Sequence, residues 1–264
     1  MSILEAIILG IIQGVAEFLP ISSSGHLALA QQLFGIEEAT LAFDVLLHVG
    51  TLIPVCVIYR REIWKLIRNP FQKTTLLLIV GTIPAVIAAL LFGDAIETLL
   101  RSMIFLAIGF AITGVVLLIA DNIRAGEKEE RDITVVDALV IGCAQGVAIL
   151  PAISRSGSTI SSSLLRGLNR ETAARFSFLL SIPAILGAAV LHMKDLFSGV
   201  DVFAGIPLAS IVVGFLVAML SGYLAIQFML KLIQKAKLKV FSIYLFALAL
   251  FIAANQFWPG GGLF

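Results

Sequence analysis

Long apolar runs separated by short charged segments dominate the chain. Six of these runs are close to the 20 or so residues that a helix needs to cross a bilayer: 42–59, 74–92, 103–120, 173–191, 206–230 and 240–257. Two further runs are shorter and are interrupted in the middle, at Pro20 and Pro151. Irregular backbone is tolerated at membrane depth only inside protein or beside a water-filled cavity. We therefore expect each interrupted run to form a re-entrant helical hairpin, over 2–36 and 134–168.

The two interrupted runs are copies of one another. They align without a gap at an offset of 132 positions, and ten of the 24 aligned pairs from 2/134 to 25/157 are identical. The copies differ where charge is carried, since the first has a carboxylate and an imidazole, Glu17 and His26, and the second has a guanidinium, Arg155. This pattern indicates two related half-sites that have specialised.

Composition and charge place the chain in a membrane. The sequence is 59% hydrophobic and 13% charged, with a net charge of +1, which is typical of an integral membrane protein and gives no basic surface for nucleic acid. Lys and Arg concentrate in 60–73 and 231–239 and are sparse in 93–101 and 193–205. The first two segments are therefore expected on the cytoplasmic side as loops, and the other two outside.

The apolar runs and the charge distribution together predict an all-α membrane protein with six transmembrane helices and two re-entrant hairpins. A single membrane domain, 1–264, would contain repeat one (1–132) and repeat two (133–264), each a hairpin followed by three spans. Because three is odd, the second repeat is inverted relative to the first. Inverted repeats with broken helices bring their breaks together near the middle of the bilayer, so we expect the turns around 22–26 and 154–159 to meet.

Some polar and sulfur-containing residues have a structural interpretation. Glu5 and Asp137 each stand three residues after a Ser or Thr that precedes an apolar run, which is the spacing of a capping box. Cys56 and Cys143 lie far apart in apolar runs and are expected to be small core residues. Asp44 and His48 lie one turn apart in the first span, where pairing with each other or support of the site explains them as well as catalysis does.

The first hairpin carries most of the candidate chemistry. Ionisable and polar groups are costly inside a membrane and by default indicate a functional site. The candidates are Gln13, Glu17, Ser22, Ser23, Ser24, Gly25 and His26. Glu17 is a candidate general base or ligand of a divalent cation, His26 a proton donor, and Ser23 a nucleophile if a base is adjacent. For any one of the serines, a simple helix cap is the alternative.

The second hairpin carries an isolated cation. Arg155 is the one basic residue outside the charged segments, and polar neighbours surround it: Ser154, Ser156, Gly157 and Thr159. A structural arginine would pair with a carboxylate, for which Glu17 is the candidate. A phosphate clamp explains more of the pattern, because hydroxyls and a glycine that exposes backbone at a helix N-terminus suit an anion and are superfluous for an ion pair.

At these residues the sequence resembles the undecaprenyl-pyrophosphate phosphatases, also called bacitracin-resistance proteins. The matching motifs are Gln13-x-x-x-Glu17-Phe-Leu-Pro-Ile-Ser-Ser-Ser-Gly-His26 and Ser154-Arg155-Ser156-Gly157-Ser-Thr159, supported by Phe43-Asp-x-x-x-His48-x-Gly50-Thr51. The similarity extends over essentially the full length. It implies a multi-pass enzyme of the cell membrane that removes the terminal phosphate of undecaprenyl pyrophosphate, a lipid carrier for cell-wall precursors.

The resemblance also implies roles for individual residues. Glu17 would be the catalytic carboxylate, with Gln13 at the neighbouring acidic-or-amide position; Ser23, Ser24 and His26 would form the catalytic turn; Ser154, Arg155 and Thr159 would bind phosphate. A divalent cation, Mg²⁺ or Ca²⁺, is implied as cofactor. One departure from the family pattern is Ala152, where glycine usually follows the proline, so the bend of the second hairpin is open.

Two functions fit these features. The first is hydrolysis of a polyprenyl pyrophosphate at a site that faces the outside. The alternative is a secondary transporter or flippase of an anionic lipid, because such proteins also use inverted repeats and broken helices. Glu17 discriminates between them, since a hydrolase loses turnover without it. The choice of Ser23 or water as nucleophile stays open, and so does a homodimer.

Overall fold

The computed structural model describes residues 1–36, 41–124, 126–197, 203, 205–235 and 237–256. Over these residues the regular structure is helical. There is no β-strand among them, only an isolated β-bridge between Lys128 and Leu168. The helices are α1 (Ile3–Phe18), α2 (Ser23–Leu33), α3 (Leu41–Ile58), α4 (Arg60–Arg68), α5 (Lys73–Leu100), α6 (Met103–Asn122), η1 (Glu130–Asp132), α7 (Val135–Val147), α8 (Arg155–Leu165), α9 (Arg170–Phe197), α10 (Leu208–Ile233) and α11 (Leu238–Gln256).

Five described helices are long and apolar enough to cross a membrane. The apolar stretches are Lys73–Gly93, Met103–Asn122, Arg170–Leu191, Leu208–Ile233 and Leu238–Gln256. A sixth is obtained if α3 and α4 are counted together, although the pair bends by 87° between Ile58 and Arg60. The protein is therefore an all-helical integral membrane protein.

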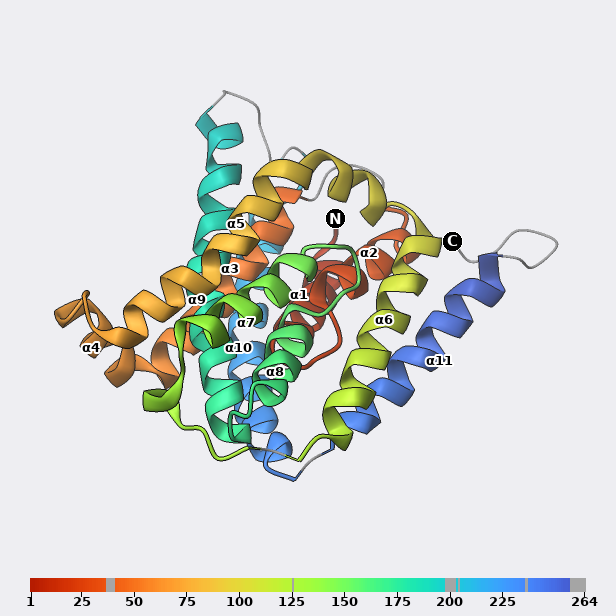
Figure 1. Cartoon of the computed structure of the whole chain (residues 1–264). Helices are drawn as coiled ribbons and strands as arrows, with labels where there is room; N and C mark the ends of the chain where they lie inside the picture. Colours follow the sequence, from red (N-terminus) through yellow and green to blue (C-terminus); the bar gives the residue numbers. More distant parts are fainter. Residues whose placement is uncertain (37–40, 125, 198–202, 204, 236, 257–264) are drawn as a thin grey trace.

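Two segments expected as loops are helical. Residues 60–68 of the expected 60–73 loop form α4, and α5 continues through the expected 93–101 loop as far as Leu100. In α4 the exposed apolar side chains Trp64 and Ile67 alternate with basic ones. This is the pattern of a helix that lies along a membrane surface. The segment was expected to be a loop because its many charged residues interrupt any apolar run. Figure 1 shows α4 projecting from the bundle.

The two interrupted runs form two helical hairpins, α1–α2 and α7–α8. Both begin with the expected capping box, in which Glu5 reaches back to the Ser2 amide and Asp137 to the Thr134 amide. Both hairpins lie at the centre of the bundle, with the longer helices around them (Figure 1). The site residues are therefore carried by the most enclosed elements of the fold.

Small residues allow the surrounding helices to pack closely on the hairpins. A Cβ added at Gly10 of α1 would lie 2.6 Å from the Gly214 carbonyl oxygen of α10, and one at Gly142 of α7 would overlap the Gly81 backbone of α5. Close backbone approach at small residues is the usual means of helix association in membranes. The hairpins are held in fixed positions by these contacts.

The two cysteines, Cys56 and Cys143, are exposed rather than core residues. In a membrane protein the outer surface faces lipid, so a small apolar side chain is equally suited to it. The end of the expected sixth span at residue 257 and positions 198–202 of the expected external loop lie outside the described residues.

Candidate active site

Glu17 lies at the end of α1, immediately before the turn of the first hairpin. The helix ends at Phe18 because Pro20 cannot continue it, and the carboxylate is only 6% exposed. A buried carboxylate requires hydrogen-bond donors or a cation. The groups that meet this requirement for Glu17 define the site.

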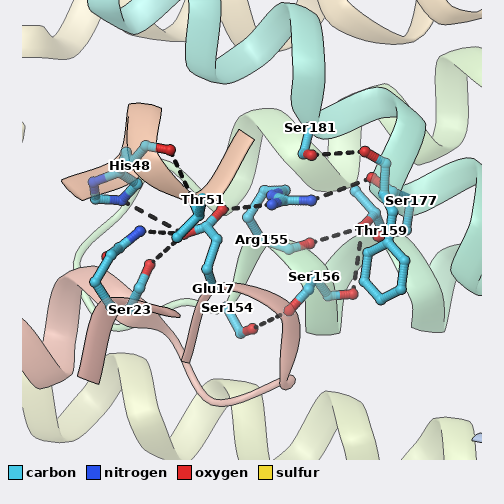
Figure 2. A network of polar contacts seen from close by, with 12 residues as sticks. Glu17, Ser23, His48, Thr51, Ser154, Arg155, Ser156, Thr159, Ser177 and Ser181 are labelled. Carbon is cyan, nitrogen blue, oxygen red and sulfur yellow. Dashed lines mark hydrogen bonds and ion pairs between the residues drawn. The ribbon is translucent and has the colours of Figure 1, made fainter. Parts of the chain in front are cut away.

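Four side chains surround the Glu17 carboxylate (Figure 2). Arg155 Nη2 lies 2.5 Å from Oε1. Ser23 Oγ and Gln13 Nε2 donate to Oε2 at 2.7 Å and 3.1 Å, and His48 Nε2 lies 3.5 Å from the same oxygen. The structural alternative for Arg155, an ion pair with Glu17, is therefore realised in the structure.

Arg155 is the first residue of α8, and its own backbone and side chain are fixed. Nη1 donates to the Ser177 carbonyl oxygen of α9 at 3.2 Å. Behind it, the buried Thr159 hydroxyl donates to the Arg155 carbonyl at 2.9 Å and lies 2.6 Å from Ser177 Oγ. The guanidinium is thus oriented from α9 as well as by Glu17, which prepares it for a bidentate contact with an anion.

The two hairpin turns meet, as the sequence predicts. Besides the pair between Glu17 and Arg155, Ser156 Oγ donates to the Leu19 carbonyl oxygen at 3.0 Å. Ala152 sits at φ 59°, in the left-handed region that favours glycine, and its methyl group packs on the hairpin-one turn. A Cβ added at Gly25 would lie 2.8 Å from Ala152 Cβ. The second hairpin therefore makes its bend with alanine in a strained conformation.

Serines at equivalent positions of the two copies, Ser22 and Ser154, cap the second helix of each hairpin. Ser22 Oγ accepts from the Gly25 amide at 3.4 Å, and Ser154 Oγ accepts from the Gly157 amide at 3.1 Å. The cap interpretation of these serines is therefore correct at the level of structure. Because both caps stand at the site, the positive ends of α2 and α8 also lie there.

A cavity of about 810 Å³ opens beside the carboxylate. One part of its wall is polar and includes Glu17 and Arg155; the rest is apolar and comes from α1, α2, α3, α5, α9 and the turn of the second hairpin. Of the residues predicted for the site, the lining includes Glu17, Ser22, Ser23, Ser24, Ser154 and Arg155. The lining also includes Gln31, Asp44, His48 and Arg101. An anionic head group and the start of an apolar chain can be accommodated together.

The other predicted residues support the cavity without lining it. They are Gln13, Gly25, His26, Ser156, Gly157 and Thr159. His26 is the main difference from expectation. Its Nδ1 lies 2.7 Å from the Ser22 carbonyl oxygen, its Nε2 lies 2.7 Å from the Tyr244 hydroxyl of α11, and its ring contacts Phe110 of α6. The imidazole predicted for catalysis thus points toward α6 and α11.

His48 of α3 is the site residue whose role was least specific on sequence grounds. With Asp44 and Val45 it forms one helical face on the cavity. In α2 the residues that line the cavity recur with helical period: Ser23, Ser24, Leu27, Ala28, Gln31 and Gln32. His26 lies two residues from Ser24, on the opposite side of the helix. The structure therefore places His48 at the cavity and directs His26 away from it.

The residues present do not form a protein cage for a metal ion. Within the described ranges, no three His, Cys, Asp or Glu side chains converge. Both Glu17 oxygens already accept from protein groups, so a cation would have to compete with Arg155 and Ser23 for this carboxylate. The cation that the family resemblance implies stays a prediction.

Comparison with known proteins identifies the family of this chain. The profile of the family described as bacitracin resistance protein BacA matches residues 6–251. The undecaprenyl-diphosphatase of Carboxydothermus hydrogenoformans is 51% identical over 97% of this chain and 98% of its own length. Undecaprenyl-diphosphatase 4 of Bacillus thuringiensis subsp. konkukian is 50% identical with the same coverage, and the undecaprenyl-diphosphatase of Methanosphaera stadtmanae is 42% identical over 92% and 94%. The chain belongs to the bacitracin resistance protein BacA family.

Proposed function

We propose that this chain hydrolyses undecaprenyl pyrophosphate to undecaprenyl phosphate and inorganic phosphate. The activity recycles the lipid carrier for cell-wall polymers and confers bacitracin resistance. One observation carries the proposal: a cavity with an apolar wall holds an arginine, a carboxylate and a hydroxyl in mutual contact, Arg155, Glu17 and Ser23. The relatives named undecaprenyl-diphosphatase, similar over nearly the whole chain, favour hydrolysis over transport.

Arg155 binds the pyrophosphate. In the structure its guanidinium neutralises Glu17, and an incoming pyrophosphate competes for the same donors. A planar guanidinium suits two phosphate oxygens at once. The transfer of Arg155 from carboxylate to phosphate also frees Glu17 Oε1, so substrate binding prepares the carboxylate for its chemical role.

Glu17 and Ser23 act at the chemical step. Ser23 already directs its hydroxyl proton to Glu17 Oε2, which is the contact that a base makes with a nucleophile. In one route Ser23 Oγ attacks the terminal phosphorus, Glu17 takes the proton, the P–O–P bond breaks and undecaprenyl phosphate leaves; water then releases phosphate from the serine. In the other route water attacks directly and Glu17 takes the proton from water. A Ser23→Ala variant distinguishes the two routes.

The membrane arrangement completes the proposal. Two inverted repeats would give six spans in the plasma membrane, with both hairpins re-entrant and the site open to the outside face. The repeated sequence at an offset of 132 and the identical serine caps support a common origin of the hairpins. The prenyl chain would stay in lipid while the head group enters the cavity. Association into a homodimer remains a prediction, tested by mass measurement in detergent.

A divalent cation, Mg²⁺ or Ca²⁺, is proposed as cofactor on the family resemblance. Mg²⁺ commonly binds through one or two carboxylates together with substrate phosphates and water. Glu17, once released by Arg155, is the carboxylate that would take part. When bound, such an ion supplies positive charge to the phosphate oxygens.

The decisive experiment is phosphate release from undecaprenyl pyrophosphate by the purified protein in detergent, with and without a chelator. The expected result is turnover that the chelator suppresses and that added Mg²⁺ or Ca²⁺ restores. Glu17→Gln and the lipid without protein are the controls. Absence of phosphate release from protein that still binds the lipid would favour the transporter. Full turnover in the presence of the chelator would contradict the proposed divalent cation and leave the proposed hydrolysis standing.

A further inference from the structure

His48 is the one described imidazole with a ring nitrogen at the reaction cavity. Its side chain is 27% exposed, on the same cavity wall as Glu17 and Arg155. His26, by contrast, has one nitrogen at the Ser22 carbonyl oxygen and the other at the Tyr244 hydroxyl. A ligand in the cavity therefore meets His48 and not His26.

The orientation of the His48 ring is set by its own helix. Nδ1 lies 2.7 Å from the Asp44 carbonyl oxygen, one turn earlier. A carbonyl oxygen has no proton, so Nδ1 carries the hydrogen and donates it. This bond fixes the ring and leaves Nε2 directed at the cavity.

Nε2 lies beside the Glu17 carboxylate. It is 3.5 Å from Glu17 Oε2, beyond the distance of a strong hydrogen bond, and that oxygen already accepts from Ser23 and Gln13. The Glu17 carboxylate is therefore not the best partner for Nε2. Arg155 contacts the other oxygen of this carboxylate. An oxygen of a phosphate that Arg155 holds in the cavity would be a better partner for Nε2.

We propose that His48 is a further catalytic residue, which acts as an imidazolium with a hydrogen on each ring nitrogen and donates a hydrogen bond from Nε2 to a non-bridging oxygen of the transferring phosphoryl group. This rests on the proposed function. The contact is not proton transfer, so no bond is formed or broken at His48. The donor strengthens its contact as charge develops on the phosphoryl oxygens, which is how a fixed donor accelerates such a step.

The role predicts a specific pattern among variants. His48→Ala removes the donor and should lower kcat about 100- to 1,000-fold, the usual effect of losing one such donor, with a change in KM of less than about threefold. His48→Gln places an amide nitrogen near the position of Nε2 and should recover most of the lost rate. Cys56→Ala, on the exposed side of the same helix, is the matched control and should behave as wild type.

A second measurement does not depend on turnover. Protein with ¹⁵N-labelled histidine in detergent is titrated with methylenediphosphonate, a pyrophosphate analogue that cannot be hydrolysed. The His48 Nε2 signal, assigned by its loss in His48→Gln, should shift, while the His26 signals should not. A shift without hydrolysis of undecaprenyl pyrophosphate would reject the proposed function and retain His48 as a phosphate contact. Wild-type kcat in His48→Ala, equal loss in His48→Gln, or an unmoved His48 signal with bound analogue would overturn the inference.

Discussion

Ser23 donates its hydroxyl hydrogen to Glu17 Oε2 across 2.7 Å, which is the contact that a nucleophilic hydroxyl makes with its base. Ser23→Ala tests whether this contact is used. We expect it to abolish phosphate release while binding of undecaprenyl pyrophosphate is kept, and wild-type protein stopped rapidly with acid should carry phosphate on Ser23. Appreciable turnover in the variant would assign the attack to water.

Arg155→Ala should raise KM and lower kcat together, because the proposed role of the guanidinium is to bind pyrophosphate in both the ground state and the transition state. Loss of a charged hydrogen bond costs about 1.5–3 kcal/mol, equivalent to about 10- to 100-fold. The variant also leaves Glu17 without its cation, so the fall in kcat/KM should exceed that range. Steady-state phosphate release measures both parameters, and Arg155→Lys, which cannot make the planar two-point contact, should recover little.

Glu17→Gln should act at the chemical step. An amide keeps the shape of the side chain but cannot take a proton, so kcat should fall by about 100-fold or more with little change in lipid binding. Kinetics and a binding measurement on the same preparation separate the two effects. Full activity would make the carboxylate structural and would favour the transporter.

His26→Ala should be milder than either of those variants, because both nitrogens of His26 hold the fold at Ser22 and Tyr244. An asparagine amide can keep the bond to the Ser22 carbonyl without any group at the position of Nε2. His26→Asn should therefore lose less than about 100-fold, the lower limit for general acid–base help. A far greater loss in His26→Asn with a normal melting temperature would place His26 in the chemistry.

Asp137 of α7 pairs with Arg166 at the end of α8, at 2.7 Å, and with Lys128 in the segment that precedes α7, at 3.2 Å. We expect Asp137→Asn to lower the free energy of unfolding by about 3 kcal/mol, the low end for breaking a buried ion pair, since both cations are partly exposed. Thermal unfolding in detergent measures this. Glu127→Gln, an exposed position close by, should change stability by less than about 0.5 kcal/mol.

The same carboxylate gives a dependence on pH. Burial raises the pKa of Asp137, but the Thr134 amide and the two cations outweigh this and hold the pKa below its usual range. A carboxylate with a lowered pKa contributes stability above its ordinary pKa of about 4, and this is lost as the pH falls further. Wild type should lose stability below about pH 4 more steeply than Asp137→Asn.

Orientation in the membrane is tested by labelling single cysteines in a chain with Cys56 and Cys143 changed to alanine. A membrane-impermeant reagent applied to intact cells should modify Ser102→Cys and not Lys65→Cys. The reason is the concentration of basic residues in 60–73, which predicts that this segment lies on the cytoplasmic side. The reverse result would invert the proposed topology.

The hairpins and their contact could be predicted from sequence because local and repeated signals agree. Pro20 and Pro151 interrupt the apolar runs, serines cap the following helices, and the offset of 132 relates the two copies. The helical state of α4 could not be obtained from a search for apolar runs, because its apolar side chains occupy a narrow face among charges. A search for amphipathic period would have found it.

The direction of a side chain around a helix was harder to predict than the helix itself. His26 belongs to the motif that contains Glu17 and Ser23, and His48 only to the supporting motif in the next helix, so proximity in sequence favours His26. Packing decides otherwise: Tyr244 and Phe110 come from helices more than 80 positions away and engage one imidazole, while α3 brings the other to Glu17. Long-range contacts of this kind leave no local signature.

The methyl group of Ala152 has an evolutionary consequence for two other positions. It occupies the space that a side chain at Gly25 or Gly109 would need, because a Cβ added at either glycine would lie 2.8 Å or 3.0 Å from it, respectively. At both positions another group lies closer still: Phe110 Cζ would lie 2.7 Å from a Cβ at residue 25, and the Pro151 carbonyl oxygen would overlap one at residue 109. Replacement of Ala152 by glycine would relieve the unfavourable φ of this residue and remove only one of the barriers to change at its neighbours. Exchange between alanine and glycine at 152 in the course of evolution therefore leaves glycine required at 25 and 109 in every descendant that keeps this fold.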